Sequence, residues 1–138
     1  MKGLEIKFSE IGITSSSEPK SKAMYMIAAN VTDDKGKKHR HYLDIAPVFS
    51  KKTPMEAWVC PMGFTLKVNG VYYVYNEAGE RLASFTADEG EVIQMNPEYI
   101  VLRKGNDASF YTHTFEFKGS RPLNPEEITG LAEGIQNE

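Results

Sequence analysis

Cysteines and long apolar runs are the scarcest features of this sequence. Cys60 is the only cysteine among 138 residues, so no disulfide can form within the chain. No run approaches the roughly 18 apolar residues that a membrane-spanning helix needs, and the N-terminus lacks the continuous apolar core of a signal peptide. These absences predict a protein of the reducing cytoplasm that has no membrane partner.

The motifs of several common enzyme classes are also missing. The sequence contains no P-loop, no dinucleotide-binding glycine fingerprint, no paired cysteines for zinc and no nucleophile elbow. Cys60 precedes Pro61 at the end of an expected helix, where a thiolate is not favoured. The balance favours a protein that is not an enzyme, and no cofactor is predicted.

Charge is nearly balanced but unevenly distributed. The net charge is −3, from 16 Lys and Arg against 19 Asp and Glu, yet residues 1–60 hold 10 of the cations and only 7 of the acids. A dedicated binder of duplex DNA is usually strongly basic, so this class is disfavoured. The first half of the chain can still form a basic patch.

Alternation of apolar and polar residues predicts about nine short β-strands. The strongest local signal is Asn69-Gly70, because this pair supplies the positive φ angles of a type I′ hairpin between two β-rich runs. Residues 14–22 are polar and predict a flexible loop. The expected strands cover 3–8, 23–31, 39–46, the two arms of 64–76, 81–86, 91–96, 99–104 and 109–118.

Two segments carry the signals of helix starts. Thr53 followed by Pro54 predicts a helix over 53–60, and Asn124 followed by Pro125 predicts a helix over 124–136. The second helix is expected to dock on the sheet through an apolar face that consists of Ile128, Leu131 and Ile135.

These elements predict one domain over residues 1–138, mainly β (α+β). We expect an antiparallel barrel or sandwich of about nine strands with two short helices. The order of elements over residues 1–76 is strand, long loop, strand, turn, strand, helix and hairpin. This order resembles the OB-fold, and the resemblance implies a barrel whose binding face lies beside the turn at 33–38.

Three glycines share a local pattern. Gly36, Gly79 and Gly119 each precede a Lys or Arg by two positions and lie between β-like segments. A glycine in the left-handed conformation closes a short hairpin loop with a bulge, so we expect each glycine to close a turn.

The segment around Gly36 is the first candidate binding site. It forms a basic hairpin tip with an aromatic residue on the following strand, and its members are Lys35, Lys37, Lys38, Arg40 and Tyr42. A basic groove with aromatic platforms is the minimum equipment for binding single-stranded nucleic acid. A solvated turn that aids solubility fits the same residues.

The same strand carries a candidate metal site. His39 and His41 are two residues apart on a strand, so both imidazoles lie on one face, as they must to share a metal ion. The sequence does not identify a third ligand. The alternative is that both histidines form local hydrogen bonds, and His113 is likewise expected within an aromatic strand face.

Three hypotheses for function follow. The favoured hypothesis is a non-enzymatic binding or assembly module that acts through its β-sheet surface on a protein partner or on a second copy of itself. The first alternative is single-stranded nucleic-acid binding by an OB-like barrel with the basic hairpin. The second alternative is a metal-dependent site on His39 and His41.

Overall fold

The computed structural model describes residues 1–13 and 23–123. Within these residues the chain forms eleven β-strands and a single 3-10 turn, η1 (Ala87–Glu89). The flexible loop expected at 14–22 and the helix expected at 124–136 lie outside the described residues. No helix in the described part of the chain is long and apolar enough to cross a membrane.

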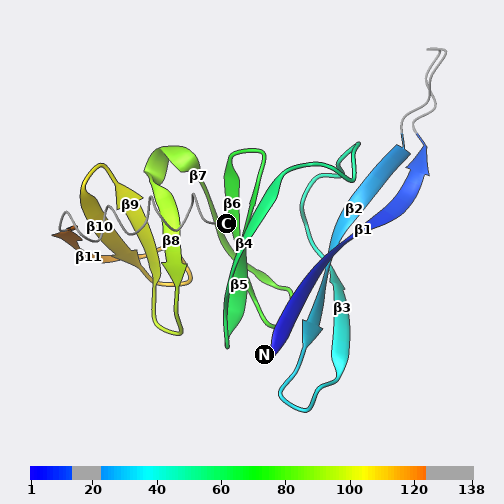
Figure 1. The fold of residues 1–138 in the computed structure, drawn as a ribbon, viewed down its shortest axis with the longest axis horizontal. Coiled ribbons are helices and arrows are strands. Elements are labelled where there is room, and N and C mark those ends of the chain that lie inside the picture. Colours follow the sequence, from blue (N-terminus) through cyan, green and yellow to red (C-terminus); the bar gives the residue numbers. More distant parts are fainter. Residues whose placement is uncertain (14–22, 124–138) are drawn as a thin grey trace, which may run out of the picture.

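The strands form three antiparallel sheets, and each sheet is a meander of strands in chain order (Figure 1). Sheet A consists of β1 (Gly3–Ile13), β2 (Ala23–Thr32) and β3 (Lys38–Tyr42). Sheet B consists of β4 (Met55–Cys60), β5 (Gly63–Val68), β6 (Val71–Asn76) and β7 (Arg81–Thr86). Sheet C consists of β8 (Glu91–Met95), β9 (Ile100–Lys104), β10 (Asp107–Tyr111) and β11 (Phe117–Pro122). The prediction of a mainly β, antiparallel protein is confirmed.

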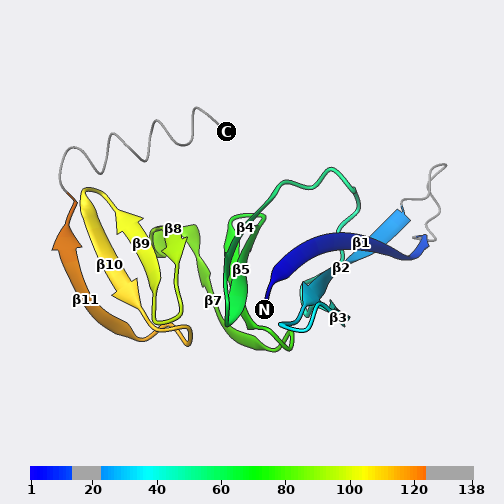
Figure 2. The ribbon, with the colours of Figure 1, turned by 60° about the horizontal axis from the view of Figure 1, so that its bottom comes forward.

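The three sheets follow one another along the long axis of the molecule, with sheet B in the middle (Figures 1 and 2). Alternation along β5 and β6 gives sheet B two apolar faces, so each face supports one core. The core between sheets A and B includes Ile27, Ala29, Val31, Phe64, Leu66 and Tyr75. The core between sheets B and C includes Tyr72, Val74, Phe85, Ile100 and Leu102.

This stack differs from the expected OB-like barrel. A barrel requires a continuous ring of strand pairs, but the described strands pair only within each of the three sheets. The described part of residues 1–76 also contains no helix between β3 and β5. The resemblance to the OB-fold is therefore wrong, because an order of elements along a chain does not determine which strands form hydrogen bonds.

The predicted helix over 53–60 is wrong, since this segment forms β4. Thr53 does not cap a helix, because its hydroxyl and its backbone N–H both donate to the carbonyl oxygen of Ser50 and close a turn. Trp58 and Val59 favour extended backbone, and all six residues of β4 pair with β5. Pairing with a buried neighbouring strand outweighs the weak local preference for a helix start.

The same turn closes the last hairpin of each sheet. In each case the side-chain oxygen of the first residue accepts the backbone N–H four residues later, and its carbonyl accepts the N–H three residues later. The first residues of the three turns are Asp33, Asn76 and Thr112. Gly36 and Gly79 occupy the left-handed position, with φ of 84° and 76°, as predicted. Gly119 lies within β11, so its predicted turn is wrong, and Phe115 with φ of 66° closes the third turn.

Sheets B and C are structural repeats offset by 36 residues. Strands β4, β6 and β7 begin at 55, 71 and 81, and strands β8, β10 and β11 begin at 91, 107 and 117. Pairs of facing residues repeat as well, since Thr65 faces Val74 while Val101 faces Phe110. A β-bulge interrupts both hairpins at equivalent positions, after Val74 and after Phe110. The two sheets therefore share the turn and the bulge of their last hairpin, while the β8–β9 pair has a further bulge after Val92 that the β4–β5 pair lacks.

Candidate functional site

The solvent-facing side of sheet A brings together three of the predicted binding residues. Side chains alternate along β3, so Lys38, Arg40 and Tyr42 are exposed on one face, and Tyr42 retains 56 % of its accessible surface. Antiparallel pairing places Glu5 and Lys7 of β1 on the same face, two strands away from Arg40 and Tyr42. We call this surface the outer face of sheet A, defined by Glu5, Lys7, Lys38, Arg40 and Tyr42.

Cations outnumber acids on the outer face of sheet A. Glu5 forms an ion pair with Lys7, and Arg40 donates from Nε to Asn30 Oδ1 at 3.0 Å. The hydrogen bond and charge of Lys7, with smaller contributions from the charges of Lys38 and Arg40, hold the pKa of Glu5 below its ordinary value. With three cations and one carboxylate, the face carries a local surplus of positive charge.

The remaining predicted cations lie elsewhere. Lys35 and Lys37 are exposed in the β2–β3 turn. Lys35 borders a hollow of about 460 Å³ on the side of the histidines, together with Asp34 and Glu77. The five predicted binding residues therefore do not form one surface, because the turn directs Lys35 away from Arg40 and Tyr42.

The two histidines occupy the other face of β3, as their spacing predicts. Their rings stack with centroids 6.5 Å apart, and His39 Nε2 lies 2.8 Å from Asp33 Oδ2. His41 packs against Gly79 in the β6–β7 turn. Among the described residues no three side chains of the types that bind metals converge here or elsewhere. The metal site on His39 and His41 stays a prediction without a third ligand, and elemental analysis of the purified protein would test it.

Asp33 gives the basic turn a predicted dependence on pH. The hydrogen bond from His39, followed by the N–H groups of Lys37 and Lys35, lowers the pKa of the Asp33 carboxyl in the folded protein. The ionised carboxylate therefore stabilises the fold fully above the pKa of the unfolded chain, about 3.9, and this contribution is lost as pH falls through the lower folded pKa. Asp33→Asn should remove this part of the pH dependence, as urea titrations between pH 2 and pH 6 would measure.

The equivalent turn at Asn76 provides the reason to choose Asn. Asn76 Oδ1 accepts the N–H groups of Ala78 and Glu80, the same two positions that bond to Asp33. An asparagine at 33 can therefore keep the turn while it lacks the titrating group. If the stability of the variant depends on pH in the same way as that of the native protein, Asp33 is not the source of this pH dependence.

Two other candidate residues have structural roles. His113 lies in the β10–β11 turn, where its Nε2 is 2.8 Å from the carbonyl oxygen of Asn96, so its expected place within a continuous strand is wrong. Cys60 ends strand β4 and is 5 % exposed. Neither residue contributes to the outer face of sheet A.

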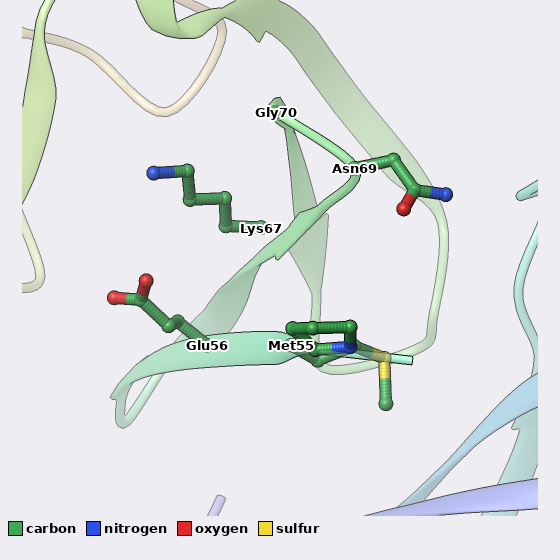
Figure 3. A pocket seen from close by; sticks show the side chains of 6 residues that line it. Met55, Glu56, Lys67, Asn69 and Gly70 are labelled. Carbon is green, nitrogen blue, oxygen red and sulfur yellow. The ribbon is translucent and has the colours of Figure 1, made fainter. Parts of the chain in front are cut away.

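A second hollow lies beside the Asn69-Gly70 turn and has a volume of about 360 Å³. Glu56 and Lys67 extend from the paired strands β4 and β5 on the same side of the sheet, and Asn69 turns away from them (Figure 3). The Lys67 ammonium lies 5.3 Å from the centre of the Tyr72 ring. The lining contains one cation and one carboxylate, Lys67 and Glu56, which face each other on β5 and β4.

Sequence reasoning missed the contribution of β1 to the candidate site. Glu5 and Lys7 alternate with apolar residues, which predicts their exposure but not the strand beside which they lie. The register of β1 with β2 is the missing information. The sequence patterns also did not predict the stack of aromatic rings between sheets B and C, which consists of Trp58, Tyr72, Phe85, Phe115 and Tyr111.

Comparison with known proteins adds no family to this geometry. No protein-family model, no curated protein and no solved structure matches the chain significantly.

Proposed function

We propose that the protein is a non-enzymatic binding module that uses the outer face of sheet A to bind an acidic surface on a protein partner. One observation carries the proposal: Lys38, Arg40 and Tyr42 are exposed in a row on β3, an edge strand of sheet A. Arginine and tyrosine are enriched at protein interfaces and often dominate binding energy. Hydrogen bonding of β3 to β2 also holds these side chains in fixed positions before binding.

Charge complementarity is expected to determine the partner. Lys7, Lys38 and Arg40 exceed the single carboxylate of Glu5, although the whole chain has a net charge of −3. Complementary charges raise the association rate and exclude partners of the wrong sign. A cationic face on an acidic protein therefore orients the approach of an acidic partner toward sheet A.

A charge reversal tests the proposal. Lys38→Glu with Arg40→Glu should weaken binding to fluorescent poly-glutamate at least about tenfold, because repulsion replaces attraction at two positions. Fluorescence anisotropy at low and physiological salt would measure the change. The matched control reverses Lys35 and Lys37, which are exposed outside this face. Equal losses in both variants would show that net charge, and not the outer face of sheet A, determines binding.

The exposure of Tyr42 favours a second candidate function, the binding of single-stranded nucleic acid. An exposed aromatic ring beside Arg40 provides a stacking surface for a base and a cation for a phosphate. Tyr42→Ala should then weaken binding to a thymidine oligonucleotide by about 1–3 kcal/mol. The slope of the logarithm of the binding constant against the logarithm of the salt concentration should become shallower by up to about 0.7 for each phosphate contact that Arg40→Gln removes. Binding of poly-glutamate without binding of the oligonucleotide would exclude this candidate.

A further inference from the structure

Strand β1 leaves one edge of sheet A without a neighbouring strand. It is the longest strand of the described chain, at 11 residues, and it pairs with β2 along one side only. Among the residues that the structure describes, no strand lies along its other side (Figure 1). We call this side the free edge of β1. An unpaired strand edge presents a row of N–H and C=O groups that can bind another strand.

The hydrogen bonds of β2 show which groups of β1 lie on the free edge. Tyr25 and Val48 exchange both backbone hydrogen bonds, so Tyr25 directs its N–H and C=O away from β1. This direction alternates along a strand, so every second residue of β2 after Tyr25 also points away from β1. Residues that face each other without exchanging hydrogen bonds both direct their groups outward. The residues of β1 that face these positions, and whose N–H and C=O groups therefore lie on the free edge, are Leu4, Ile6 and Phe8.

We propose that β1 pairs with β1 of a second copy of this chain, antiparallel and about a two-fold axis at Ile6. Leu4 of each copy then faces Phe8 of the other, and Ile6 faces its own equivalent. All three residues exchange both backbone hydrogen bonds in this register, so the groups on the two free edges satisfy one another. Such an interface uses the same surface on both copies, as two-fold symmetry requires. The three strands of sheet A in each copy join into one continuous sheet.

Charge selects this register among those that the hydrogen bonds permit. With the axis at Ile6, Glu5 faces Lys7 of the other copy, and Glu10 faces Lys2. All four of these charged side chains are exposed. An axis at residue 5 or at residue 7 would instead place Glu5 or Lys7 opposite its own equivalent, and like charges that face each other destabilise a strand pair. The free edge of β1 is therefore complementary in charge to itself.

Incomplete burial of the apolar side chains favours the same partner. Leu4, Ile6 and Phe8 pack against the core between sheets A and B but are only partly buried. In the proposed register Leu4 of one copy lies directly beside Phe8 of the other, on the core side of the sheet. A second copy therefore covers apolar surface that β1 leaves exposed at its edge.

This pairing is independent of the function proposed above. Lys38, Arg40 and Tyr42 lie on β3, at the opposite edge of sheet A, so a second copy on β1 leaves them uncovered. Failure of the outer face of sheet A to bind an acidic partner would leave the pairing of β1 unaffected.

Complementary charge variants test the register. Glu5→Lys places a lysine opposite Lys7 of the other copy, and Lys7→Glu places a glutamate opposite Glu5. Each substitution alters two symmetry-related pairs, so each variant alone should dimerise at least about tenfold more weakly than the native protein. A mixture of the two variants should recover the association as a heterodimer, because two lysines then face two glutamates. Sedimentation velocity of the full-length chains would measure all of these associations.

Glu98→Lys and Lys104→Glu are the matched controls. They change the net charge by the same amounts at exposed positions outside sheet A, and they should leave dimerisation unchanged. A native protein that is monomeric at millimolar concentration would overturn the proposal. Undiminished dimers of Glu5→Lys or Lys7→Glu, or a mixture that associates no better than either variant, would also overturn it.

Amide hydrogen exchange in the native protein tests the contact without any substitution. The N–H groups of Glu5 and Lys7 point toward β2, whereas those of Leu4, Ile6 and Phe8 lie on the free edge. At millimolar concentration we expect the three edge amides to exchange within about tenfold of the rates of Glu5 and Lys7. Rapid exchange at the three edge amides, with Glu5 and Lys7 protected, would overturn the proposal even if the protein dimerises through another surface.

Discussion

Phe64→Ala is expected to lower the free energy of unfolding by about 3–5 kcal/mol, one of the largest effects that a single substitution should have in this protein. Phe64 is 0 % exposed and stacks on Tyr75 with ring centroids 5.2 Å apart. It lies on β5 of the middle sheet, and the other face of that sheet supports the second core. The surrounding strands cannot collapse into the cavity without disturbing both cores, so the upper part of the range applies. Urea denaturation would measure the loss.

Phe49→Ala is the matched control, because Phe49 is 56 % exposed and loses little burial on truncation. We expect its unfolding free energy to stay within about 0.5 kcal/mol of the native protein. A domain of this size has a total stability of about 5–15 kcal/mol, so the two variants should be easily distinguished. Similar losses at both positions would contradict the layered arrangement of sheets A and B.

Local chemistry predicted the features that depend on few neighbours. Asn69 and Gly70 have φ angles of 52° and 78°, as a type I′ turn requires, and β5 and β6 pair around them. Alternation on β3 correctly separated Arg40 and Tyr42 from the histidines. In both cases the residues that determine the geometry are adjacent in sequence.

Features that depend on distant pairing could not be predicted in this way. Residues 53–60 carry a local signal for a helix start, yet β5 requires a neighbouring strand and the segment supplies it. The outer face of sheet A depends on the register of β1, which brings Lys7 opposite Ala28 and near Tyr42. A periodic pattern indicates which face a residue occupies but not which strand lies beside it.

The β10–β11 turn shows a second reason why local sequence patterns do not always predict the geometry of a turn. Phe115 takes the left-handed position that glycine takes in the other two turns, although this conformation is unfavourable for a bulky side chain. Its ring lies between Phe85 and Tyr111, with centroid distances of 4.1 and 4.2 Å. Stacking between sheets B and C thus compensates for the backbone conformation. A search for glycine alone selects Gly119 and misses Thr112, the residue that begins the turn.

Gly79→Ala should destabilise the protein more than Gly36→Ala, although both glycines hold the same position in the same turn. Both have positive φ angles, which cost an alanine about 1–2 kcal/mol. A Cβ at Gly36 would meet no atom within 4 Å, whereas a Cβ at Gly79 would lie 2.5 Å from the Cβ of His41. Overpacking of this kind adds about 1–3 kcal/mol, so we expect a loss of about 2–5 kcal/mol at Gly79. Urea denaturation of the two variants would measure the difference.

His41→Gly in the Gly79→Ala background tests the cause of that difference. Removal of the imidazole and its Cβ eliminates the atoms that the new methyl group would meet, while the positive φ at position 79 is unchanged. In a double-mutant cycle the two substitutions should therefore couple favourably by about 1–3 kcal/mol, and His41→Gly should show no such coupling with Gly36→Ala. Additive losses at 41 and 79 would mean that β3 and the β6–β7 turn do not touch. The packing of sheet A against sheet B at this turn would then be wrong, and with it the position of the histidine face of β3.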